Sequence, residues 1–205
     1  MPIIGSRGAW QGGERLDDKA RRAVQDAESL AASYGMRQAT PDVLLRALVD
    51  DDDGAPARAL VGAGGAVDAL RAALDQTLDR RASALGGRSA LDADARDAVV
   101  LGINEARREG FEQASTGHLL LGLVAARAGK GVRQVARQGA GIAVLRPLVR
   151  ELQEGGSGGS ATAALFAASF PRFLAQVGRA ATCATCGAPL HDSFHYCYNC
   201  GAQHE

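Results

Sequence analysis

The chain has 205 residues, with 23 basic and 23 acidic side chains and a formal net charge of zero. Hydrophobic residues make up 46 % of it and aromatic residues only 4 %, so the core must be built mainly from Ala, Leu and Val, which favours packed helices over a β-sandwich. The balanced charge also makes general binding to nucleic acid an unfavoured function, because such proteins usually carry a basic excess.

Residues 1–13 are predicted to be a flexible tail. They lack the apolar run of a signal peptide. No stretch of the sequence approaches the roughly 20 apolar residues of a transmembrane helix. A cytoplasmic location is therefore expected.

Residues 14–153 contain one pattern twice, with 75 residues between equivalent positions. Asp17, for example, is matched by Asp92 (92 − 17 = 75). The spacing holds without a gap across helix-start and turn residues. The sequence therefore predicts a duplicated structural unit, with repeats at about 14–80 and 89–153.

Each repeat is predicted to form four helices. The first begins at Asp17, an aspartate that suits the N-cap, and ends before Gly35, which suits the left-handed turn after a helix. The second begins with Thr40 as a hydroxyl cap, Pro41 in the first turn and Asp42 near the positive end of the helix dipole. The expected helices span about 17–34, 40–49, 56–61 and 68–78, then 92–109, 115–124, 132–137 and 144–152, with Pro147 in the first turn of the last.

Two segments, 20–49 and 95–124, carry a resemblance to a known family. They contain Thr40-Pro41-Asp42-Val43-Leu44-Leu45 and Thr116-Gly117-His118-Leu119-Leu120-Leu121-Gly122-Leu123. This ordered pattern resembles the double Clp repeat, the N-terminal domain of Clp-type ATPases, over about residues 14–153. The resemblance implies an all-α, pseudo-two-fold duplicated four-helix bundle. In the family, that domain binds adaptors and substrates and delivers them to an ATP-driven unfolding ring.

No Gly-x-x-x-x-Gly-Lys-Ser/Thr loop occurs in the sequence, so this chain is not expected to be the ATP-driven motor. The sequence also shows no nucleophile–base set, open metal site or cofactor loop. An enzymatic function is therefore not expected.

The resemblance also suggests candidate ligand residues. Some family members hold phosphorylated arginine in two equivalent pockets, each with a glutamate at the start of the second helix. Asp42 and Gly117 stand at those positions here, so only the first retains a carboxylate that could pair with a guanidinium. The candidates are Asp42, Thr40, Thr116 and His118. Alternatively, Asp42 only stabilises its own helix, and His118 is a packed, hydrogen-bonded residue.

Residues 154–180 are predicted to connect two domains. The stretch 154–160 is rich in Gly and Ser and is typical of a flexible tether, with an engineered linker as the alternative. Phenylalanines then recur at helical spacing over 161–180, although Pro171 should interrupt a helix there. This apolar segment either packs on a neighbouring domain or docks into a partner's groove.

All four cysteines belong to two Cys-x-x-Cys-Gly motifs, formed by Cys183 with Cys186 and by Cys197 with Cys200. Two thiolates three positions apart can hold one metal ion from a tight turn, and two such turns complete a tetrahedral site. The pattern resembles a short zinc ribbon over residues 181–205, with structural Zn2+ as the cofactor. Two disulfides, a redox-active cysteine pair and an iron site are less favoured alternatives.

The leading interpretation is a non-enzymatic accessory protein or adaptor of Clp-type chaperone and protease systems. The bundle would recognise a client polypeptide, an adaptor or a Clp ATPase. The ribbon would contact a second protein, because residues 183–205 contain no Lys or Arg to bind phosphate. The alternatives are a decoy that sequesters ligands of Clp N-terminal domains, and a regulatory or nucleic-acid-associated factor that acts through the ribbon.

Overall fold

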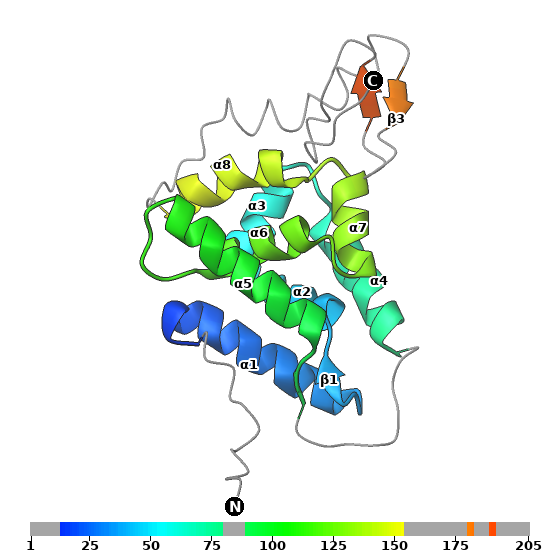
Figure 1. Cartoon of the computed structure of the whole chain (residues 1–205). Coiled ribbons are helices and arrows are strands. Elements are labelled where there is room, and N and C mark those ends of the chain that lie inside the picture. The colour runs from blue at the N-terminus through cyan, green and yellow to red at the C-terminus, as the bar shows by residue number, and fades with distance from the viewer. Residues whose placement is uncertain (1–12, 80–88, 154–179, 183–188, 192–205) are drawn as a thin grey trace, which may run out of the picture.

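The computed structural model describes residues 13–79, 89–153, 180–182 and 189–191 (Figure 1). These described residues form a helical bundle of eight α-helices, together with short strands. The helical elements are η1 (Gly13–Arg15), α1 (Asp18–Ser33), α2 (Pro41–Leu48), α3 (Ala55–Gly62), α4 (Val67–Asp79), α5 (Ala93–Arg108), α6 (Thr116–Ala126), α7 (Lys130–Arg137) and α8 (Ile142–Gln153). The strands are β1 (Gln38–Ala39), β2 (Ala90–Leu91), β3 (Ala180–Thr182) and β4 (Pro189–His191).

The predicted helical character is confirmed, and each expected helix overlaps an observed one. The helices α5 to α8 each begin 75 residues after α1 to α4 in turn (93 − 18, 116 − 41, 130 − 55 and 142 − 67). Two helix starts were placed wrongly, because α7 and α8 each begin two residues earlier than expected. Because α8 begins two residues earlier than expected, Pro147 lies inside this helix instead of in its first turn, where it removes one helical hydrogen bond.

Aspartate caps hold the starts of the two longest helices. Asp17 accepts a hydrogen bond from the backbone N–H of Ala20 at 2.7 Å, and Asp92 accepts one from Ala95 at the same distance. Gly35, after α1, has a φ of 64°, a left-handed conformation that glycine adopts without strain. These cap and turn predictions are confirmed.

Main-chain pairings join the first half of the bundle (13–79) to the second half (89–153). β1 pairs with β2 in parallel, and the N–H of Asp92 donates to the carbonyl of Ala39 at 3.0 Å. At the positions related by the 75-residue spacing, the N–H of Asp17 donates to the carbonyl of Ala114, also at 3.0 Å. Each half therefore fixes the start of the other half's long helix. These two strands were not predicted from the sequence.

The core consists of Ala, Leu and Val side chains with a single Ile among the described residues, as the composition predicted. The closest helix packing lies between α5 and α6. A Cβ atom on Gly102 would lie 2.6 Å from the carbonyl oxygen of His118, and one on Gly122 would overlap the backbone of Ala98. Glycine at both positions permits this backbone contact, so α6 is held deep in the bundle.

Near the C-terminal end, β3 and β4 pair antiparallel, with Ala180 opposite His191 and Thr182 opposite Pro189. The predicted tether, the Phe-rich segment and the four cysteines lie outside the described residues, as do residues 1–12 of the predicted tail. Gly13, the last residue assigned to that tail, instead begins η1. Within the described part of the chain, no helix is both long and apolar enough to cross a membrane.

Candidate functional site

The candidate ligand residue Asp42 is buried, with 1 % of its surface exposed. One carboxylate oxygen, Oδ1, accepts a hydrogen bond from the backbone N–H of Gly131 at 2.9 Å. Gly131 is the second residue of α7, where backbone N–H groups have no acceptor within their own helix. Asp42 therefore caps α7, a helix in the other half of the bundle. Its negative charge also lies at the positive end of the α7 dipole, which is a favourable arrangement.

The matching position in the second half is Gly117, and its surroundings differ from those of Asp42. A Cβ atom on Gly117 would lie 2.7 Å from Cγ1 of Val149 and 3.5 Å from Cβ of Ala55, so a side chain has little room. The residue that matches Gly131 is Pro56, which has no backbone N–H to be capped. The related pair of positions, Gly117 and Pro56, thus lacks both the acid and the donor that the acid would serve.

The two threonine candidates have different surroundings. Thr40 precedes α2, but its side chain makes no capping hydrogen bond, so the predicted hydroxyl cap is wrong. Its Oγ1 is buried, with no hydrogen-bond partner among the described residues. Thr116 is the first residue of α6 and is half-buried. Ser115 caps that helix instead, through its side-chain oxygen.

His118 is fully buried in the first turn of α6. The backbone N–H of Ser115 donates to Nδ1 at 3.1 Å, and Oγ of Ser115 lies 2.9 Å from the same nitrogen. Since Nδ1 accepts, the neutral ring carries its proton on Nε2, which lies 3.4 Å from a carboxylate oxygen of Glu109. Burial lowers the pKa of His118, although the Glu109 carboxylate acts in the opposite direction. These contacts fit the packed, hydrogen-bonded alternative.

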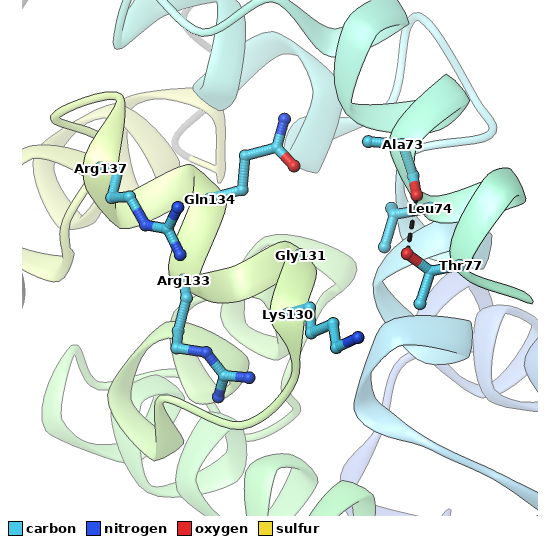
Figure 2. Close-up of a pocket in the computed structure, with 8 residues that line it drawn as sticks. All are labelled: Ala73, Leu74, Thr77, Lys130, Gly131, Arg133, Gln134 and Arg137. Carbon is cyan, nitrogen blue, oxygen red and sulfur yellow. Dashed lines mark hydrogen bonds between the residues drawn. The ribbon is translucent and has the colours of Figure 1, made fainter.

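Two surface cavities occupy positions that are related by the 75-residue spacing. The smaller, of about 370 Å³, lies between α4 and α7 (Figure 2). It is lined by Ala73, Leu74, Thr77, Lys130, Gly131, Arg133, Gln134 and Arg137. The larger, of about 620 Å³, involves α1, α3, α6 and α8 and contains Ala55, Pro56 and Arg58, which match Lys130, Gly131 and Arg133.

The two cavities differ in charge. The lining of the smaller one includes three cationic side chains and no acid. The larger one combines Lys19, Arg22 and Arg58 with Asp17, Asp26, Asp51 and Asp53. Thr116 also lines the larger cavity, whereas Asp42, Thr40 and His118 line neither. The four candidates therefore do not converge on one cavity, and the cations of α7 are binding candidates that the sequence interpretation missed.

The predicted metal ligands Cys183, Cys186, Cys197 and Cys200 lie outside the described residues. Within the described ranges, no group of three or more His, Cys, Asp or Glu side chains could hold a metal ion. Residues 183–188, between β3 and β4, include the first Cys-x-x-Cys-Gly motif.

Comparison with known proteins identifies relatives of the helical part. Residues 15–93 match the family model described as the Clp repeat (R) N-terminal domain. The chaperone protein ClpB of Brucella suis is 28 % identical over 152 residues, which are 73 % of this chain and 17 % of ClpB. The chain thus spans less than a fifth of the length of that relative.

Solved structures share the fold. The N-domain of ClpV from Vibrio cholerae superposes with a TM-score of 0.61 at 17 % identity, covering 78 % of this chain and 96 % of that domain. A ClpV N-domain in complex with a VipB peptide superposes with a TM-score of 0.57 at 16 % identity, covering 74 % of this chain and 98 % of that one.

Replacing Asp42 with alanine should destabilise the bundle, because the N–H of Gly131 loses its acceptor. We expect the free energy of unfolding in urea to fall by about 1–3 kcal/mol, and the Gly131 amide to exchange faster with solvent. Asp42→Asn, which retains an acceptor oxygen, should lose less. Thr40→Ala is the matched control, since it removes a hydroxyl that makes no cap bond. Unchanged exchange at Gly131 in Asp42→Ala would contradict the capping role.

The burial of His118 predicts a pH dependence of stability. Because its folded-state pKa lies below the ordinary value of 6.5, the unfolded chain binds the proton first as the pH falls. Stability is therefore retained above pH 6.5 and lost between 6.5 and the lowered folded value, by at most about 1.4 kcal/mol per pH unit. Urea denaturation at a series of pH values should show this slope, and His118→Gln should remove it. An identical slope in the variant would refute the assignment.

Proposed function

Because residues 15–93 match the model of the Clp repeat N-terminal domain and the helical part is similar in sequence to ClpB chaperones, we propose that it is a protein-binding module. The chain then acts as an accessory protein or adaptor of Clp-type chaperone systems. It recognises a client polypeptide, another adaptor or a Clp ATPase through the bundle. The observation that carries this proposal is the shared fold with a ClpV N-domain that was solved with a bound VipB peptide.

The two surface cavities support a binding function. Both are open to solvent and combine charged side chains with small apolar surfaces, which suits recognition of an extended polypeptide segment. The backbones that form them are well anchored, since Asp42 holds the start of α7 at the smaller one. A partner would therefore meet a preformed surface and would lose little free energy in ordering it.

We propose a non-catalytic function for the bundle. Ser115 contacts His118, and His118 contacts Glu109, in the order of a nucleophile, a base and an acid, but the site does not suit catalysis. Ser115 is only 5 % exposed, and His118 is fully buried. The Nδ1 lone pair that would take the serine proton already accepts the backbone N–H of Ser115. Ser115 and His118 instead stabilise the start of α6 as a capping box.

For the C-terminal part, we propose that Cys183, Cys186, Cys197 and Cys200 hold one structural zinc ion. Their spacing supplies four thiolates, which fill a tetrahedral shell and leave no open position for catalysis. The antiparallel pairing of β3 with β4 on either side of the first motif is compatible with a ribbon. This small domain would contact a second protein.

The binding proposal can be tested by affinity capture with the full chain from a lysate of the source organism. We expect Clp ATPases, their adaptors or their substrates to be enriched, because the bundle carries the Clp-type recognition domain. A chain with all four cysteines replaced by serine should retain them, since the bundle does not depend on the ribbon. Enrichment of ribosomal or nucleic-acid complexes alone would contradict the proposal.

The zinc proposal predicts one zinc ion per chain, measured by elemental analysis of the purified protein. Chelation should release it and change the signals of residues 181–205, while the helical circular dichroism of the bundle is retained. Replacing Cys183 and Cys197 together should abolish zinc binding. Replacing Ser193, which is not a thiol, should not. A global loss of helix on chelation would contradict two independent domains.

A further inference from the structure

Charge is segregated between the two halves, although the whole chain is neutral. Between residues 113 and 150 the sequence has no acidic residue and six basic ones, Arg127, Lys130, Arg133, Arg137, Arg146 and Arg150. The matching segment 38–75 has seven acidic residues and three basic ones. Every charged side chain of the helices α6 to α8 up to residue 150 is therefore positive.

Three of these cations lie on the exposed side of α7. Lys130, Arg133 and Arg137 are all exposed, and their spacing of three and four places them on one face of the helix. Val132 and Val135 are buried on the opposite face. The cationic face is thus oriented outward by the packing of the helix.

No acidic side chain among the described residues pairs with these three cations of α7. This differs from other arginines of the bundle. Arg46 contacts both Asp50 and Asp75 at 2.7 Å. Arg146 contacts the buried Glu105 at 2.9 Å. The face of α7 consequently retains a positive charge that the bundle itself does not neutralise, and such a face attracts anionic partners.

The cationic face borders the smaller cavity, whose opposite wall is apolar. Ala73 and Leu74 of α4 form part of that wall. Gly131 forms its floor, since a Cβ atom there would lie 2.6 Å from Cδ2 of Leu74. Figure 2 shows Lys130 extending from α7 toward Leu74 and Thr77, with Arg133 along the same helix. The cavity can therefore accept a small apolar group against α4, while the cations of α7 line its other side.

We propose that this cavity binds an acidic polypeptide segment, with its carboxylates on Lys130, Arg133 and Arg137 and an apolar side chain against Leu74. The inference rests on the proposed protein-binding function and adds the charge of the ligand. A cationic group such as guanidinium is not accommodated, because no acid lines the cavity and the Asp42 carboxylate is buried and bonded to the backbone of α7.

An acidic polypeptide fits this cavity better than nucleic acid does. No aromatic side chain lines the cavity, so bases have no stacking surface. A short segment that alternates acidic and apolar residues can place its charges on α7 alone.

The test is fluorescence anisotropy of the full chain with a labelled peptide of sequence Glu-Asp-Leu-Glu-Glu-Leu-Asp-Glu. We expect saturable binding that weakens as salt rises, and at least about tenfold weaker binding to the same peptide with Gln and Asn in place of its acids. Lys130→Glu combined with Arg133→Glu should weaken binding by about tenfold or more. Arg96→Glu is the control, because Arg96 is an exposed cation of α5 that lines neither cavity. It should change binding by less than about twofold.

Three results would overturn the proposal. They are unchanged binding by the double variant, an equal effect of Arg96→Glu, and equally tight binding of a short oligothymidylate. Circular dichroism of each variant excludes unfolding as the cause of a loss. Failure of the wild-type chain to bind the peptide, with Clp components still captured, would refute only this inference. Failure of both measurements would refute the proposed function as well.

Discussion

The hydrogen bond from the backbone N–H of Gly131 to Asp42 fixes the start of α7 against α2 and thereby connects the two halves of the bundle. A buried carboxylate is costly unless it is bonded, so this contact determines where both helices can lie. It also constrains the residue before α7. Gly129 has a φ of 92°, and a Cβ atom there would overlap the Asp42 carboxylate. Only glycine can adopt this φ without strain and also leave room for the carboxylate. Because glycine has no side chain to cap α7, Asp42 of the other half provides the cap.

The hydrogen bond from Gly131 to Asp42 changes which charge the half of the bundle with Asp42 presents to a ligand. The resemblance to the Clp family suggested that Asp42 would face a cationic ligand. The structure places its carboxylate inside the protein, where α7 uses it, and leaves Lys130 and Arg133 at the cavity that a ligand can reach. Because a buried acid that is bonded to backbone has little attraction left for an external cation, the exposed cations determine the sign of the cavity. The sequence motif therefore suggests a cationic ligand, whereas the surface charge suggests an anionic one.

The fold was largely predictable from the sequence, because helix caps and apolar periodicity are local signals. The aspartates before α1 and α5 and the regular spacing of 75 residues placed the helices correctly. Strands of two residues were not predictable, since alternation cannot be recognised over so short a length. The role of Asp42 was missed because its partner lies 89 residues away and because α7 was expected to begin at Val132, two residues late. The neutral total charge concealed the basic segment, since a sum over the chain averages the two halves.

At two buried contacts, both members differ from the residues at the positions related by the 75-residue spacing. Asp42 and the N–H of Gly131 correspond to Gly117 and Pro56, which lacks that N–H. The close contact of α5 with α6 uses Gly102 and Gly122, where α1 and α2 have two alanines. A change at one member of a buried contact requires a compensating change at the other, whereas exposed residues are free of this requirement. The lining of the two cavities can therefore differ without disturbing the bundle, which allows one scaffold to present two differently charged cavities.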